Sequence, residues 1–108
     1  MSNHCHALIK PKILDNSEEP VALGIIMQRL KGYTAKEANS ILGRTGQTFW
    51  QDESFDHWIR NDQEFERGVS YIENNPVKAG LVTSRDQWKW SSASERVRRG
   101  LGYFDCLT

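Results

Sequence analysis

Hydrophobic and polar positions alternate at the start of the chain. Over residues 2–9, SNHCHALI, the side chains of His4, His6 and Leu8 fall on one side of an extended backbone and their neighbours fall on the other. This period of two predicts a β-strand. Residues 10–20 contain two prolines and a polar cluster, which predicts a connecting loop.

The period then changes to that of an amphipathic helix. Apolar residues at i, i+3, i+4 and i+7 form one stripe: Leu23, Ile26, Met27 and Leu30. Capping-box spacing at Thr34 leaves two alternatives open, because the helix either restarts there after Gly32 or runs through to about Leu42. Gly43 is expected to end it.

A second helix is predicted after Asp62, a natural N-cap residue. Its apolar face is formed by Phe65, Val69 and Ile72. Because the residue before a proline avoids the helical region, the helix is expected to end before Pro76. Residues 77–80, VKAG, predict one further turn closed by Gly80.

Aromatic and basic residues gather outside these helices. Residues 48–60 place aromatic and β-branched residues around a polar centre, which predicts a strand, a turn and a second short extended piece. Trp88 and Trp90 are two apart, so in an extended segment they share a face and close the domain rather than bind a ligand. The tail forms either a last helix or a loose end. Its basic residues, interpreted as a solvated face, are Arg96, Arg98 and Arg99.

Length and composition limit the class of protein. A chain of 108 residues can build one modest core, so we expect a single domain over residues 1–108, with residues 93–108 as a loosely packed tail. No apolar run approaches the roughly 18 residues of a membrane span, which predicts a soluble, cytoplasmic protein.

The 14 basic and 14 acidic residues cancel, which argues against a protein that binds duplex DNA with its whole surface. Cys5 and Cys106 are too few for a disulfide framework or a four-cysteine zinc site.

Two pairs of polar side chains are candidates for chemistry. His4 and His6 project to one face of the predicted strand, so both imidazoles can reach one metal ion, or they are simply partly exposed polar residues on a sheet. Tyr71 and Asn75 are four residues apart and form a stacked pair beside the apolar stripe of the second helix. The alternative is a tyrosine that lies over the edge of the core, with Asn75 capping the helix end.

Several blocks of the sequence resemble a known family. The opening SNHCHALI resembles the Met-Pro-Asn-His-Val-His-Leu-Leu-Ile segment of the His-hydrophobic-His (HUH) tyrosine transposases, most closely the branch associated with repetitive extragenic palindromes (REP elements). Further blocks of that branch are matched in order by IMQRLKGYTAKEAN, FWQDESFDHWIRND, YIENNPVKAGLV and WKWSS. The resemblance covers roughly residues 2–92, and blocks in register are more specific than any single motif.

The resemblance implies an enzyme that cuts and rejoins single-stranded DNA at hairpin-forming repeats, in DNA transposition or repeat processing. Tyr71 matches the family's nucleophile, whose phenolate attacks the scissile phosphate and leaves a 5′-phosphotyrosine and a free 3′-hydroxyl. His4, His6 and Asn75 match the residues that hold a divalent cation, Mg²⁺ or Mn²⁺, which acts as a Lewis acid on the phosphate. A phenol, with a pKa of about 10, needs such help.

The resemblance also implies an α+β fold, the ferredoxin-like sandwich of the HUH transposases. In that fold the paired histidines lie on a central strand and the tyrosine helix packs with its side chain facing them. Family members carry about one strand and one helix ahead of the histidines, whereas Met1 stands three residues before His4. We therefore expect this chain to lack the first strand and helix. Cys5 replaces the usual aliphatic residue and Ser2 a proline, and both changes are tolerable.

The expected partner is single-stranded or hairpin DNA, without a membrane, and both a monomer and a dimer fit the sequence. The side chains predicted to contact DNA are His57, Arg60, Lys78, Arg29 and Lys31. Three classes of function compete: an active transposase, an inactive or domesticated remnant that only binds DNA hairpins, and a structural zinc protein built on the histidines and a cysteine. The four site residues together favour the enzyme, whereas the expected missing segment favours the remnant. The position of Cys106, far along the chain, gives the zinc protein little support.

Overall fold

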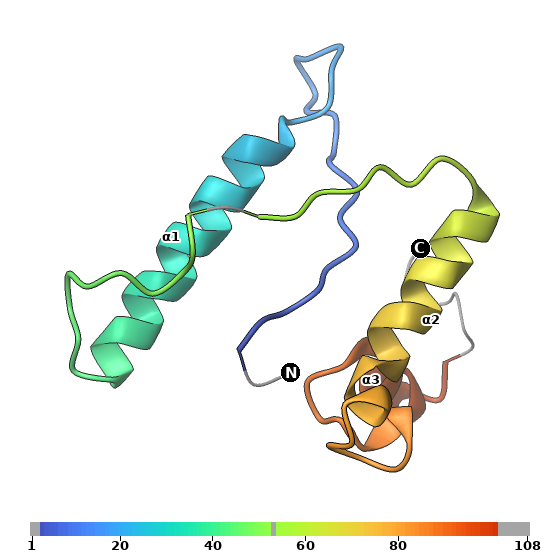
Figure 1. Cartoon of the computed structure of the whole chain (residues 1–108). Coiled ribbons are helices and arrows are strands. Elements are labelled where there is room, and N and C mark those ends of the chain that lie inside the picture. Colours follow the sequence, from blue (N-terminus) through green and yellow to red (C-terminus); the bar gives the residue numbers. More distant parts are fainter. Residues whose placement is uncertain (1–2, 53, 102–108) are drawn as a thin grey trace. The chain divides into compact units, whose positions relative to one another are not determined.

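The structure, a computed structural model, describes residues 3–52 and 54–101 (Figure 1). Its regular elements are α1 (Leu23–Ile41), α2 (Asp62–Lys78), the short 3₁₀-helix η1 (Arg85–Gln87) and α3 (Ser92–Arg99). The chain divides into two compact units. The first unit comprises Met1–Leu8 and Trp58–Thr108, and the second comprises Ile9–His57.

The prediction of an α+β, ferredoxin-like sandwich is wrong. The described part of the chain contains helices and one isolated antiparallel bridge, between Ile13 and Pro20, but no sheet. A strand exists only where a neighbouring strand supplies ladder hydrogen bonds, and alternation of side chains does not supply that neighbour. Residues 4–9 therefore keep their alternating pattern without forming the predicted strand.

The structure of α1 shows which of the two alternatives at Gly32 is correct. It runs unbroken to Ile41, so Thr34 lies inside the helix and not at a new start. The Thr34 hydroxyl donates to the Leu30 carbonyl at 2.7 Å, the bond that a threonine makes within a helix. The predicted end at Gly43 is confirmed, because Gly43 has a φ of 67° and turns the chain out of the helix.

The loop after α1 returns along that helix through side-chain hydrogen bonds. Trp50 Nε1 donates to the Thr34 hydroxyl at 2.8 Å, and Lys31 Nζ donates to the Gln51 carbonyl at 2.7 Å. These contacts tie the loop to a helix rather than to another extended segment. The strand, turn and extended piece predicted over residues 48–60 are accordingly absent from the described residues there.

Helix α2 differs from its prediction at both ends. Its N-cap is Asn61 and not Asp62, since the Asn61 side chain accepts a first-turn N–H at 2.8 Å. The helix passes through Pro76, which cannot donate to the carbonyl four residues earlier. The last turn is closed instead by the Leu81 N–H, which donates to the Pro76 carbonyl at 3.0 Å, while Gly80 adopts a φ of 75°. The prediction that the helix ends before Pro76 is therefore wrong, because the helix continues to Lys78 with the loss of one hydrogen bond.

The substitution Gly80→Ala is expected to lower the free energy of unfolding by about 1 kcal/mol, because an L side chain is strained at this φ even with open space around it. Gly68→Ala in the same helix is the matched control. It is expected to raise that free energy by about 0.5 to 1 kcal/mol, since alanine favours helix and its Cβ would meet Leu8 and Ile59 at ordinary contact distances. Urea unfolding followed by circular dichroism measures both, and effects of the same sign would contradict this account.

Candidate functional site

The spacing of apolar residues decides which face of α2 is packed. Val69 is buried and Phe65 and Ile72 are half-buried, which confirms the predicted apolar face. At 100° per residue, Tyr71 lies about 120° from Phe65 around the helix axis. Tyr71 therefore lies outside the packed face, and 57% of it is exposed.

The opening segment of the first unit brings a histidine to this tyrosine. The ring centroids of His6 and Tyr71 are 5.7 Å apart, with ring planes at 81°. Two residues later Leu8 faces Gly68, where an added Cβ would lie 3.7 Å from Leu8 Cδ2. Residues two apart share a side of an extended segment, and residues three apart share a helix face. Contact between Leu8 and Gly68 therefore places His6 against Tyr71.

The two histidines have a spacing that suits a shared cation. Their ring centroids are 5.1 Å apart, with ring planes at 89°. Two imidazoles on one ion have centroids roughly 4.5 to 5.2 Å apart, given a metal–nitrogen bond of about 2.1 Å and a bond angle of about 90° to 110°. His4 Nδ1 lies 2.7 Å from Asn3 Oδ1, a contact that leaves its other ring nitrogen for a ligand. The spacing of the two rings is compatible with a shared divalent cation, and it is also that of an ordinary edge-to-face ring contact.

The third predicted ligand, Asn75, lies one helical turn after Tyr71 on α2 and is half-buried. Within residues 3–52 and 54–101, no group of three or more His, Cys, Asp and Glu side chains is arranged to hold a metal ion. Cys5 is an exposed thiol, and Cys106, the other cysteine of the zinc alternative, lies outside the described residues.

The environment of His6 favours its neutral form. Partial burial lowers the pKa of His6, and the neighbouring charge of His4 lowers it further. The neutral imidazole is also the form that binds a metal ion.

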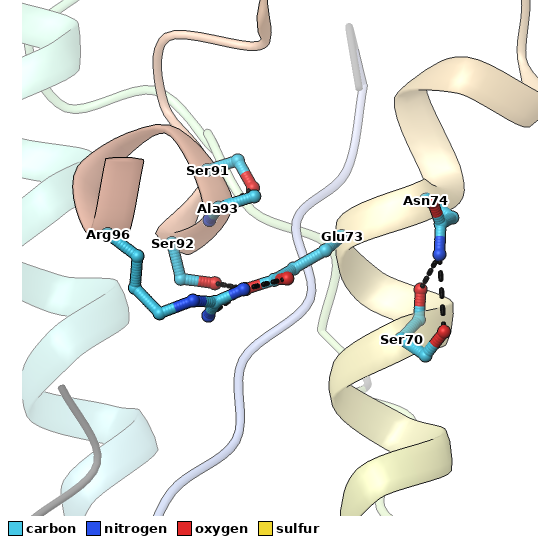
Figure 2. Close-up of polar contacts among 7 residues, drawn as sticks. All are labelled: Ser70, Glu73, Asn74, Ser91, Ser92, Ala93 and Arg96. Carbon is cyan, nitrogen blue, oxygen red and sulfur yellow. Dashed lines mark hydrogen bonds and ion pairs between the residues drawn. The ribbon is translucent and has the colours of Figure 1, made fainter. Parts of the chain in front are cut away.

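The opposite side of α2 carries a buried ion pair that the sequence analysis missed. Glu73 has no exposed surface, and both of its carboxylate oxygens accept N–H groups of Arg96 on α3 (Figure 2). The Ser92 hydroxyl donates to the same carboxylate at 2.6 Å. Because Glu73 follows Tyr71 by two residues, their side chains point about 160° apart around the axis. The ion pair therefore holds one side of α2 and leaves Tyr71 open on the other.

This ion pair corrects the interpretation of the basic tail. Arg96 is only 5% exposed, so it is not part of a solvated face, whereas Arg98 and Arg99 are exposed. One feature of the sequence could have indicated a buried ion pair. Glu73 lies four residues after the core residue Val69, and a carboxylate at the edge of an apolar face needs a cationic partner. The sequence did not say which arginine supplies it.

Acid is expected to weaken this ion pair. Burial by itself raises the pKa of Glu73, but hydrogen bonds from Arg96 and Ser92 and the nearby guanidinium charges outweigh burial and hold the pKa below its ordinary value of 4.5. A carboxyl with a lowered folded pKa stabilises the fold above its unfolded pKa, and this stability is lost as pH falls through the folded pKa. The difference in unfolding free energy between the wild type and Glu73→Gln should therefore be largest above about pH 5 and shrink below about pH 4. Urea titrations from acid to neutral pH measure it, and a difference independent of pH would be the contrary result.

The five residues predicted to contact DNA are divided between the two units. Arg29, Lys31 and His57 belong to the second unit, and Arg60 and Lys78 belong to the first. Lys31 also donates to the Ser54 hydroxyl at 3.3 Å, in addition to its bond to the loop carbonyl, so it has a local structural role. The other four side chains are exposed. Contact with DNA stays a prediction for all five.

Comparison with known proteins adds one similarity. The chain is 40% identical over 52 residues to the REP-associated tyrosine transposase of Escherichia coli (strain K12). The match covers 48% of this chain and 32% of the relative, so the chain spans about a third of the length of the relative it matches. No protein-family model and no solved structure matches the chain. The relative's name supports the family resemblance that the sequence blocks carry.

A separate finding concerns membranes. None of the helices in the described part of the chain combines the length and the apolar character that a membrane span requires. The longest, α1, has 19 residues, and basic and acidic side chains interrupt it.

Proposed function

We propose that this chain takes part in the cleavage and rejoining of single-stranded DNA at hairpin-forming repeats, as a transposase or repeat-processing nickase in the cytoplasm. The observation that carries the proposal is the contact between the His6 and Tyr71 rings, with His4 beside His6. The name of the Escherichia coli relative, a tyrosine transposase associated with REP elements, supports it. A tyrosine beside paired imidazoles provides a nucleophile and a cation site together.

Tyr71 is the proposed nucleophile. Its phenolic oxygen forms a bond to phosphorus as the bond from phosphorus to the 3′ oxygen breaks, which gives a 5′-phosphotyrosine and a 3′-hydroxyl. The phenol loses one proton and the departing oxygen gains one, so the step balances without a further reactant. Rejoining reverses it, because the tyrosine ester retains the energy of the phosphodiester. Exposure of more than half of Tyr71 lets a DNA strand approach it.

The proposed cation ligands are His4, His6 and Asn75. A bound Mg²⁺ or Mn²⁺ would supply Lewis-acid stabilisation of charge on the phosphate oxygens. The chain's own contribution is to keep the imidazole of His6 neutral and next to the phenol ring. The ion pair of Glu73 with Arg96 keeps α2 in place on its other side.

The proposal is tested with a single-stranded hairpin oligonucleotide that carries unpaired flanks and a different label at each end. With Mg²⁺ or Mn²⁺, the 3′-labelled part should stay attached to the protein after denaturation, and the 5′-labelled part should be released with a free 3′-hydroxyl. A chelator should prevent both. Binding of the hairpin without any covalent product would instead favour the DNA-binding remnant.

The substitution His6→Ala is expected to slow cleavage by about 100-fold, the order of loss when several kcal/mol of charge stabilisation is removed. Hairpin affinity should change little, since stacking and phosphate contacts supply most of it. Cys5→Ala on the same segment is the matched control and should cleave at the wild-type rate. If Cys5→Ala abolished metal binding and lowered the melting temperature, the zinc alternative would be favoured.

A further inference from the structure

Trp90 is exposed, although the sequence predicts that it packs with Trp88 to close the domain. It lies between η1 and α3 and is 81% exposed, whereas Trp88, two residues earlier, is half-buried. The prediction that both residues close the domain is therefore wrong for Trp90. An indole carries one of the largest apolar surfaces of any side chain, and leaving it in water forgoes much of the stabilisation that burial gives. Such exposure suits a residue that packs against a ligand.

The neighbouring lysine gives this surface a charge. Lys89 Nζ lies 4.6 Å from the centroid of the Trp90 ring, within the range of a cation–π interaction. Residues 85–99 hold five basic and two acidic side chains in a chain whose formal charges cancel. Glu73 neutralises one of the five, Arg96, and the segment still keeps a positive surplus. A flat aromatic ring with an adjacent cation is complementary to a base and its phosphate.

We propose that Trp90 and Lys89 form a subsite for one unpaired nucleotide, with the base stacked on the indole and its phosphate near the Lys89 ammonium. The base has to be unpaired, because in a duplex both of its faces are covered by neighbouring bases. This inference rests on the proposed function, and it adds a contact to the single-stranded flank of a hairpin. The subsite is not part of the cleavage chemistry and needs no metal ion.

The inference is tested by fluorescence anisotropy in the presence of a chelator, with a hairpin that carries a single-stranded flank and the same hairpin without it. Trp90→Ala should weaken binding of the flanked hairpin by about 10-fold, within the range for loss of one base–aromatic stack, and should leave the blunt hairpin unchanged. Trp90→Phe, which keeps an aromatic face, should lose less than about threefold. Lys89→Ala should reduce the slope of log affinity against log salt by about one phosphate contact.

Val97 supplies the matched control, because it is an apolar residue without an aromatic face, 66% exposed on α3 of the same unit. Val97→Ala should bind the flanked hairpin as the wild type does, and circular dichroism should show every variant folded. Wild-type affinity in Trp90→Ala, an equal loss for both hairpins, or an equal loss in Val97→Ala would overturn the inference. Sedimentation offers a further contrary result. If the wild type were an oligomer and Trp90→Ala a monomer, the surface would be an interface between copies of the chain, and the inference would be overturned.

The proposed nucleophile and the proposed nucleotide subsite can be refuted independently of each other. A chain that shows these affinity changes but forms no covalent product keeps the subsite and loses the nucleophile. A chain that forms the covalent product while Trp90→Ala binds normally keeps the nucleophile and loses the subsite.

Discussion

Replacement of Arg96 by alanine is expected to lower the free energy of unfolding by about 3 to 5 kcal/mol. The substitution leaves the Glu73 carboxylate buried without its partner, and this penalty, rather than the attraction within the pair, accounts for most of the effect. Small proteins have a total stability of about 5 to 15 kcal/mol, so the loss is a large part of the whole. Urea unfolding at pH 7 measures it.

Two further variants distinguish this explanation from a general effect of removing an arginine. Arg98→Ala removes a cation whose pair with Glu95 is exposed, and it should cost less than about 1 kcal/mol. The double substitution Glu73→Leu with Arg96→Met removes both charges and should recover most of the stability lost in Arg96→Ala. Equal losses in Arg96→Ala and Arg98→Ala would contradict the buried ion pair.

Tyr71→Phe is expected to abolish the covalent product with DNA. The substitution removes only the hydroxyl that attacks phosphorus, so hairpin affinity should stay within about twofold of the wild type. Denaturing gel electrophoresis of the labelled hairpin measures the product, and anisotropy measures affinity on the same preparation. The effect on the reaction and the lack of effect on binding together identify a nucleophile.

Tyr33→Phe is the control for this prediction, because it removes the same hydroxyl from another exposed tyrosine, on α1. It should form the covalent product at the wild-type rate. Tyr103, the third tyrosine, lies outside the described residues. A product that persists in Tyr71→Phe and disappears in Tyr33→Phe would show that the nucleophile lies on another helix.

The two long helices, α1 and α2, could be predicted from the sequence because their determinants are local. The repeat of apolar residues predicts most of α1 and the packed face of α2, and a glycine with positive φ ends α1 where expected. Pro76 was misread for an equally local reason. The prediction rested on the tendency of the residue before a proline to avoid the helical region, whereas Asn75 lies inside the helix, which continues to Lys78.

The remaining errors concern contacts between distant parts of the chain. Alternation at His4 and His6 predicted which side chains share a side, but no partner strand lies beside them in the described residues. Glu73 and Arg96 are 23 residues apart, and the sequence does not say that they meet. The site was predicted chiefly through the family resemblance, and the structure adds the distance between the rings of His6 and Tyr71.

The most direct measurement is peptide mass spectrometry of the covalent product formed by the wild-type chain with a flanked hairpin and Mg²⁺ or Mn²⁺. After nuclease and protease digestion, the account predicts a nucleotide linked through its 5′ phosphate to Tyr71, in the peptide that also contains Glu73 and Asn75. A nucleotide on Tyr33, on Tyr103 or on a serine, with Tyr71 unmodified, would contradict it.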